Sequence, residues 1–268
     1  MAFDKNRKEN KSAVLEAEHL CFSYDGAEEV IRDLSIRVRP GRITSLLGAN
    51  GCGKSTLFGL LTNKLEPDEG VVRLGGEDIG ELSRKEFARS VAIVQQHNIA
   101  PPDLTVERLV GYGRTPYLSA FQSAGGRGDR EAIDWAMEVT KTKELRGRAV
   151  SSLSGGQRQR VWIAMALAQE TDILFLDEPT TYLDIRYQIE VLRLIRELNR
   201  VYGLTIVMVL HDINQAMAYS DHIVGMKDGR LIAEGDPAKI VDQDLIEALY
   251  GIRLPVIEAD GRKVVLGY

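Results

Sequence analysis

The stretch that decides the fold is Gly48-Ala49-Asn50-Gly51-Cys52-Gly53-Lys54-Ser55-Thr56, which directly follows the apolar run Ile43–Leu47. It fits the pattern G-x-x-x-x-G-K-[S/T], whose glycines let backbone N–H groups surround a phosphate without Cβ clashes. A helix that starts at Lys54 would present its positive N-terminal end to the same anion. The stretch therefore predicts a strand, a phosphate-binding loop (P-loop) and a helix. A glycine-rich turn before an ordinary helix is the alternative.

Two side chains of this loop carry specific chemistry. Lys54 offers a full positive charge to the β and γ phosphates of a nucleotide, and the hydroxyl of Ser55 can bind Mg²⁺. The remaining residues contribute mainly backbone amides. We therefore expect all nine residues to contact a bound nucleotide, with Ser55 also acting as a metal ligand.

Two further apolar runs end at polar residues in the same way as Ile43–Leu47. They are Ile173–Leu176 before Asp177 and Ile206–Leu210 before His211. Such runs are typical of buried parallel strands, and each is followed by a predicted helix. The alternation of strand and helix predicts an α/β domain with a parallel sheet. Ligands bind at the carboxyl ends of the strands in such sheets.

Two parts of the chain depart from this alternation. Residues 14–42 alternate apolar and polar side chains around the turn Asp25-Gly26, which predicts antiparallel strands. Residues of about 97–170 are predicted to be mostly helical, and we interpret them as an insertion into the α/β core. The expected organisation is a disordered tail at 1–13 and one domain at 14–268, whose core comprises 14–96 and 171–268.

The composition limits the classes of partner. The 268 residues carry a net charge of -5, which argues against nucleic acid as the main partner. The two cysteines, Cys21 and Cys52, match no metal-ligand spacing, and a reducing cytosol fits their small number. No apolar run approaches the roughly 20 residues that a membrane span needs. A role at a membrane would therefore need a partner that spans it.

Two carboxylates and a histidine follow the predicted strands. Asp177 is placed to hold a metal, and Glu178 to activate a water molecule as general base, because neighbouring strand residues point to opposite sides. His211 is a candidate for contacting the γ-phosphate or orienting the water. A pair of helix-capping acids and a packing histidine are the plainer alternatives, but the P-loop upstream favours the catalytic interpretation.

A second anion site is predicted at Leu153-Ser154-Gly155-Gly156-Gln157, before the apolar helix Val161–Ala168. Ser154 is a natural N-cap, and the two glycines leave backbone amides open at a positive helix end. One chain with one nucleotide site has little use for a second anion site. We therefore expect a head-to-tail homodimer in which this helix end covers the γ-phosphate held by the other copy. A plain capped helix is the alternative.

Together these motifs resemble those of the nucleotide-binding subunits of ABC transporters, over nearly the whole chain. The P-loop, the signature Ser154–Gln157, the run Ile173–Glu178 and His211 occur in the family's order. The resemblance implies an ATP hydrolase that uses ATP and Mg²⁺. It also implies the ABC ATPase fold, a P-loop NTPase core with an N-terminal antiparallel β part and an inserted helical part.

The resemblance implies roles for further residues. Tyr24 is similar to the aromatic residue that stacks on adenine. Gln96 is similar to the glutamine that touches Mg²⁺ and the attacking water, with Gln95 as the competing candidate. Asp184, in Thr181-Tyr182-Leu183-Asp184, is similar to the aspartate that helps to couple the two nucleotide sites.

One stretch narrows the kind of transporter. Leu104–Tyr117 (LTVERLVGYGRTPY) resembles a segment of importers of ferric siderophores, haem and vitamin B12, and Pro179–Asp184 resembles the siderophore branch. The resemblance implies a ferric-siderophore importer, with a haem or vitamin B12 importer or a soluble ABC ATPase as alternatives. It also implies an integral membrane permease and, indirectly, a substrate-binding protein as partners. The chain would then lie peripherally at the cytoplasmic face of the inner membrane.

Overall fold

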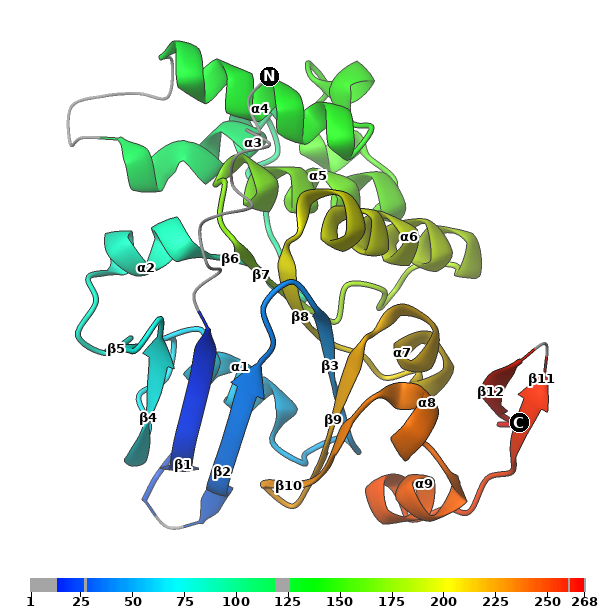
Figure 1. Ribbon diagram of the computed structural model, residues 1–268. Helices are drawn as coiled ribbons and strands as arrows, with labels where there is room; N and C mark the ends of the chain where they lie inside the picture. The colour runs from blue at the N-terminus through cyan, green and yellow to red at the C-terminus, as the bar shows by residue number, and fades with distance from the viewer. Residues whose placement is uncertain (1–13, 27, 119–125, 260, 268) are drawn as a thin grey trace. The chain divides into compact units, whose positions relative to one another are not determined.

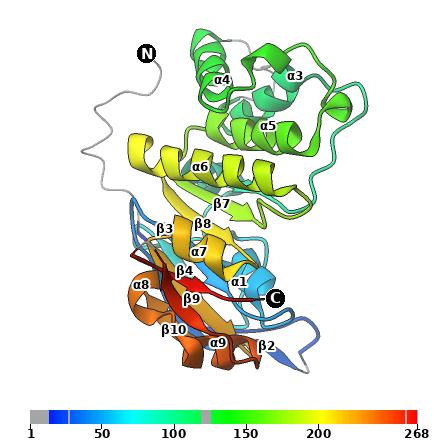
Figure 2. The same cartoon turned by 90° about the vertical axis from the view of Figure 1, so that its right-hand side faces the viewer.

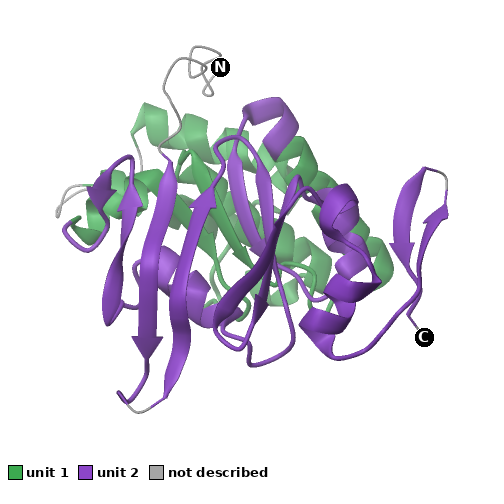
Figure 3. Ribbon diagram, turned by 60° about the horizontal axis from the view of Figure 1, so that its bottom comes forward, with its two compact units in different colours: residues 1–12, 82–198 green, residues 13–81, 199–268 purple. Residues whose placement is uncertain are grey.

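The computed structural model describes residues 14–26, 28–118, 126–259 and 261–267, so the expected tail at 1–13 lies outside the described part. The chain divides into two compact units, which Figure 3 colours separately. Unit 1 contains Leu82–Leu198, and unit 2 contains Ala13–Glu81 and Asn199–Tyr268.

Unit 2 begins with an antiparallel sheet of order β2-β1-β4-β5. Buried apolar side chains such as Leu15 and Ala17 occupy one face of β1, where exposed or partly exposed residues alternate with them. The expected antiparallel strands around the Asp25-Gly26 turn are confirmed. The strands of this sheet are β1 (Leu15–Ser23), β2 (Glu29–Val38), β4 (Glu69–Leu74) and β5 (Glu77–Asp78).

The predicted parallel strands of unit 2 are also present. Strand β3 (Ile43–Leu47) pairs in parallel with β8 (Thr205–Val209) and with β9 (His222–Lys227). All residues of β3 and β8 are buried, as expected for strands that are covered on both faces. Strand β8 ends one residue earlier than predicted. Strand β10 (Arg230–Gly235) adds an antiparallel edge to β9.

The helices of unit 2 follow its strands. The helix α1 (Lys54–Leu61) begins at the P-loop lysine, and α7 (Ile213–Tyr219) has the predicted bounds. Toward the chain end lie α8 (Pro237–Ile240), α9 (Gln243–Tyr250) and the hairpin of β11 (Val256–Ala259) and β12 (Arg262–Val265). Figure 2 shows this hairpin beside α7, with which β12 is in contact. The C-terminal segment therefore packs on elements that follow the parallel strands.

Unit 1 contains two parallel strands, β6 (Val91–Val94) and β7 (Ile173–Asp177), and most of the helices. Helices α3, α4 and α5 contact one another and form the helical layer seen in Figure 1. The helices of this unit are α2 (Arg84–Ser90), α3 (Val106–Gly111), α4 (Arg127–Val139), α5 (Gly155–Ala168), α6 (Ile185–Tyr202) as far as Leu198, and the short 3₁₀ helices η2 (Tyr112–Tyr117), η3 (Lys143–Leu145) and η4 (Val150–Ser152).

None of the helices that the structure describes is long and apolar enough to cross a membrane. Both cysteines are free thiols, with Cys52 buried and Cys21 partly exposed.

Candidate functional site

The P-loop lies in unit 2 between β3 and α1, and its glycines are required by the backbone. Gly48, Gly51 and Gly53 have φ angles of 149°, 81° and 104°, which disfavour other residues. Gly48 also lacks room for a side chain, because a Cβ there would lie 2.2 Å from the carbonyl oxygen of Met226. The first glycine of the motif is therefore fixed both by conformation and by close packing.

The side chain of Lys54 is buried inside this loop. Its Nζ donates hydrogen bonds to the carbonyl oxygens of Gly48 at 2.8 Å and of Ala49 at 2.9 Å. These bonds hold the ammonium group within the loop and stabilise the loop's curvature. Gly53 is the N-cap of α1 and makes no side-chain hydrogen bond to the amides of the first turn.

Tyr24 is positioned beside the P-loop helix. Its hydroxyl hydrogen-bonds the hydroxyl of Thr56 at 3.1 Å, and its ring meets Phe22 edge-on at 4.9 Å. The tyrosine nevertheless remains 66% exposed. A ring that is held in place and still open to solvent has the geometry that stacking on a nucleobase requires.

His211 lies at the same end of the parallel strands as the P-loop. Leu46 of β3 is paired with Val209 of β8, and Gly48 and His211 each come two residues later. His211 is exposed, and the next residue, Asp212, caps α7 by accepting a hydrogen bond from the amide of Gln215 at 2.9 Å. The proposed contact of His211 with a γ-phosphate stays a prediction.

The two carboxylates lie in unit 1, at the end of β7. The strand ends at Asp177, and Glu178 adopts a left-handed backbone conformation with φ of 48°. The explanation from strand alternation is therefore wrong for Glu178, because this residue is no longer part of the strand. A left-handed turn sets the direction of its side chain.

Two neighbours hold the carboxylate of Glu178. The Nε2 of Gln96 donates to Oε2 of Glu178 at 2.5 Å, and the hydroxyl of Thr181 donates to the same oxygen at 2.9 Å. The side chain of Gln95 is exposed, and its backbone carbonyl accepts a hydrogen bond from Asn98. Of the two candidate glutamines, Gln96 is the one that contacts the carboxylate. Such fixed hydrogen bonds orient a carboxylate for proton abstraction.

The signature forms a capped helix end in unit 1. The hydroxyl of Ser154 accepts from the amide of Gln157, and the side chain of Gln157 accepts from the amide of Ser154, which makes a capping box. A Cβ on Gly156 would lie 2.4 Å from the ring of Tyr187. The second glycine is therefore needed for close packing against α6. Tyr187 could not be identified from the sequence, because no local pattern links it to the signature.

The loop that leads into α6 is also well defined. The carboxylate of Asp184 accepts from the backbone amide of Tyr187 at 3.1 Å and so caps the helix. Tyr182 has a φ of 63° and is 84% exposed, and its ring stacks near that of His97 at 6.1 Å between centroids. His97 directly follows Gln96. The loops that carry Gln96 and Asp184 are thus in contact within unit 1.

The segment Leu104–Tyr117 is anchored by a buried arginine. Arg114 donates to Asp129 at 2.9 Å, to Glu170 at 2.7 Å and to the carbonyl of Ala168 at 2.7 Å. Its guanidinium group also lies 4.2 Å from the centre of the Tyr117 ring. A buried cation with this many partners fixes the segment firmly to the end of α5.

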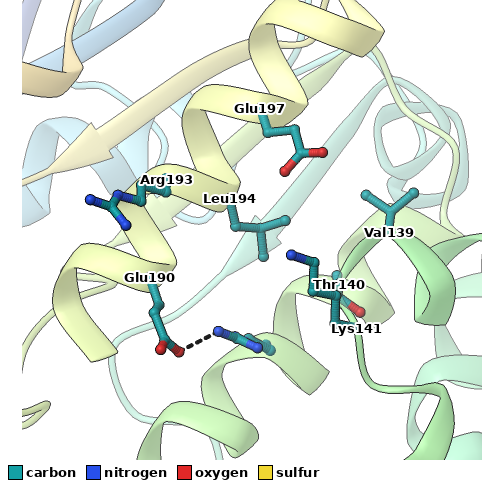
Figure 4. Close-up of a pocket in the computed structure, with 8 residues that line it drawn as sticks. Val139, Thr140, Lys141, Glu190, Arg193, Leu194 and Glu197 are labelled. Carbon is teal, nitrogen blue, oxygen red and sulfur yellow. Dashed lines mark hydrogen bonds and ion pairs between the residues drawn. The ribbon is translucent and has the colours of Figure 1, made fainter. Parts of the chain in front are cut away.

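Two cavities of unit 1 differ in their relation to these residues. The cavity in Figure 4 has a volume of about 230 Å³ and is lined by residues of α4, α5 and α6, among them Glu190, which forms an ion pair with Arg160. It contains none of the predicted site residues. A second cavity of about 450 Å³ is lined by Gln96, Gly155 and Thr181 together with Trp162 and Tyr182. The second cavity therefore belongs to the candidate site.

Comparisons with known proteins support one family. The family model described as ABC transporter matches residues 31–181. The ferric enterobactin transport ATP-binding protein FepC of Escherichia coli (strain K12) is 44% identical over 246 residues, which cover 92% of this chain and 90% of FepC. The iron(3+)-hydroxamate import ATP-binding protein FhuC of Bacillus subtilis (strain 168) is 43% identical over 243 residues, which cover 91% of this chain and 90% of FhuC.

A solved structure gives the same result for the fold. A metal-chelate type ABC transporter in an inward-facing conformation matches with a TM-score of 0.81 at 27% identity, covering 95% of this chain and 98% of its own. The predicted ABC ATPase fold is therefore confirmed. From the motifs, the fold and these relatives together, we conclude that the chain belongs to the ABC transporter family and is one of its ATP-binding, ATP-hydrolysing subunits.

Proposed function

We propose that this chain drives an importer of ferric siderophores. The observation that carries the proposal is the similarity to FepC and FhuC, which are named for transport of ferric enterobactin and iron(3+)-hydroxamate. The anchored segment Leu104–Tyr117 fits the proposal, because it resembles a segment of these importers. A haem or vitamin B12 importer remains the alternative that the uptake experiment below distinguishes.

The proposed nucleotide site is shared by two copies of the chain. ATP binds to the P-loop of one copy, with Tyr24 stacked on adenine and Lys54 against the β and γ phosphates. Ser154 and Gln157 of the other copy then cover the γ-phosphate through their capped helix end. A homodimer would use both anion sites, the P-loop and the signature, whereas one chain alone binds one nucleotide at its P-loop.

The donor chemistry of the three predicted metal ligands suits a magnesium ion. Mg²⁺ prefers oxygen ligands and is usually held by one or two protein groups together with phosphates. Ser55, Asp177 and Gln96 offer a hydroxyl, a carboxylate and an amide oxygen, and we propose that they hold the ion. No group of three or more histidine, cysteine or acidic side chains is placed to bind a metal in the described ranges. The bound ion would offset charge on the phosphates.

Hydrolysis requires a water molecule aimed at the γ-phosphate. We assign its activation to Glu178, whose carboxylate is oriented by Gln96 and Thr181. His211 contacts the γ-phosphate or orients the water. Asp184, which caps α6 close to the signature, couples the two nucleotide sites of the dimer.

The partners follow from the type of transporter. ATP-binding subunits of importers work with membrane permease components, and we propose that an integral permease docks beside Leu104–Tyr117. Closing and reopening of the ATPase dimer would switch the permease between two orientations. We place the chain peripherally on the cytoplasmic face of the inner membrane, with a substrate-binding protein delivering cargo to the permease on the other side.

The test of the cargo is uptake of radioactive iron by cells that lack this chain. Cells complemented with the wild type should import one or more ferric siderophores, and cells with Glu178→Gln should not. Parallel assays with haem and labelled vitamin B12 serve as competitors. Uptake of haem or vitamin B12 alone, without any siderophore, would contradict the proposed cargo.

A further inference from the structure

Tyr250 is a residue of unit 2 that no motif accounts for. It is the last residue of α9, and its ring is partly buried. Its hydroxyl oxygen is fully buried but has no hydrogen-bond partner of good geometry among the residues that the structure describes. A buried polar atom of this kind needs an explanation, because most such atoms in proteins are paired.

The packing of α9 brings Tyr250 close to the P-loop. Helix α9 contacts β9, where a Cβ on Gly225 would lie 3.1 Å from the side chain of Leu249. Gly225 is in turn the parallel partner of Leu47, the last residue of β3. The P-loop begins at the next residue. Tyr250 follows Leu249 on α9, and groups of the P-loop, Gly48 and Cys52, act on its hydroxyl.

The polar surroundings of the Tyr250 hydroxyl belong to the nucleotide-binding end of the sheet. Burial raises its pKa to about 12, and the backbone N–H of Gly48 opposes this rise in pKa by pointing toward the oxygen. The thiol of Cys52 and the carboxylate of Asp212 raise the pKa further. At neutral pH the phenol is therefore protonated, with lone pairs that can accept a hydrogen bond.

Gly48 is the residue whose position decides the shape of the loop. Its carbonyl accepts the hydrogen bond from Lys54. A Cβ at this position would lie 2.2 Å from the carbonyl oxygen of Met226 and 2.6 Å from Sγ of Cys52. A small displacement of Gly48 would therefore also move the ammonium group of Lys54. A hydrogen bond from the amide of Gly48 to an acceptor on α9 would fix the position of Gly48.

We propose that Tyr250 is a positioning residue for the P-loop, whose hydroxyl accepts a hydrogen bond from the Gly48 amide when the loop holds a triphosphate. The proposal rests on the proposed nucleotide site. Tyr250 does not touch ATP and acts only through Gly48. It therefore affects the affinity for ATP more than the rate of the chemical step.

The experiment compares the full-length wild type with Tyr250→Phe by steady-state ATPase kinetics and thermal unfolding. Loss of one hydrogen bond should raise the KM for ATP about three- to tenfold, while kcat changes less than about twofold. The Tm should stay constant or rise, because the variant removes a buried hydroxyl that lacks a partner. Tyr202→Phe, at the end of α6, is the matched control and should change neither KM nor kcat.

Three results would overturn the proposal. An unchanged KM in Tyr250→Phe would remove the hydroxyl from any positioning role. A lower Tm together with a lower kcat would indicate a purely structural tyrosine. An equal rise of KM in Tyr202→Phe would show that the effect is not specific. A further variant, Lys54→Ala, distinguishes a failure of the proposed nucleotide site from a failure of the role proposed for Tyr250. If Lys54→Ala still binds ATP normally, the proposed nucleotide site itself is wrong.

Discussion

The P-loop of unit 2 (the backbone half of the proposed site) and the residues around Glu178 in unit 1 (its side-chain half) are built in different ways. The P-loop in unit 2 is defined by backbone, with positive φ angles at three glycines and a lysine bonded to its carbonyl groups. The proposed hydrolytic half in unit 1 is defined by side chains, since Glu178 is hydrogen-bonded by Gln96, which is distant in the sequence, and by Thr181, which lies three residues further along. A backbone site tolerates few substitutions but is contiguous in sequence. A side-chain site depends on contacts between distant residues.

The largest expected effect is in the side-chain half. Glu178→Gln keeps the shape of the residue but removes the base, so kcat should fall by roughly 10²- to 10⁴-fold. ATP should still bind, because the P-loop is unchanged. Turnover measured by phosphate release, with ATP-dependent dimerisation followed by size-exclusion chromatography, checks both statements. Full turnover in this variant would show that Glu178 is not the base.

The next effect tests the backbone half. Gly48→Ala places a Cβ 2.2 Å from the carbonyl of Met226 at a φ of 149°, so the free energy of unfolding should fall by about 3 kcal/mol and ATP binding should be lost. Gly51→Ala is the matched control, because its φ is also positive but nothing lies within 4 Å of the new Cβ. Denaturant unfolding and ATP titration measure the difference. Equal losses in both variants would mean that strain alone, and not packing, fixes Gly48.

The free energy of unfolding should also depend on pH through Tyr250 of the P-loop half. Burial disfavours the Tyr250 phenolate and raises its pKa from 10.0 to about 12, so the free energy of unfolding keeps its full value below pH 10 and falls as the pH rises through 12. Two pKa units correspond to about 2 to 3 kcal/mol. The free energy of unfolding of the wild type should therefore fall more steeply over this range than that of Tyr250→Phe. Parallel curves for the two proteins would contradict the raised pKa.

The smallest effect concerns the support of the catalytic carboxylate. Gln96→Ala removes the hydrogen bond from Nε2 of Gln96 to Glu178, and kcat should fall by about tenfold, which corresponds to about 1.4 kcal/mol. Gln95→Ala is the control, since the side chain of Gln95 is exposed. A larger loss for Gln95→Ala in the ATPase assay would reverse the assignment of the two glutamines.

The sequence alone was sufficient for elements that repeat a local pattern. The strand Ile43–Leu47, the helix at Lys54 and the cap at Ser154 follow from apolar runs, glycine spacing and capping chemistry, and all three are present. The left-handed turn at Glu178 could not be foreseen, because φ at a non-glycine residue depends on the surrounding packing. Tyr187 and Tyr250 were missed for a similar reason. Tyr187 packs against Gly156, and the Tyr250 hydroxyl is influenced by the backbone of Gly48, each from a helix that is distant in sequence.

The anchoring of Arg114 has a mechanical consequence. Arg114 is tied to the carbonyl of Ala168, the last residue of α5, and the first residue of that helix follows the capping serine of the signature. A helix of 14 residues is about 21 Å long and behaves as a stiff rod. A force applied to the 3₁₀ helix that carries Arg114 would thus travel along α5 with little loss. In the proposed complex, α5 would connect the docking site of the permease with the signature that covers the γ-phosphate.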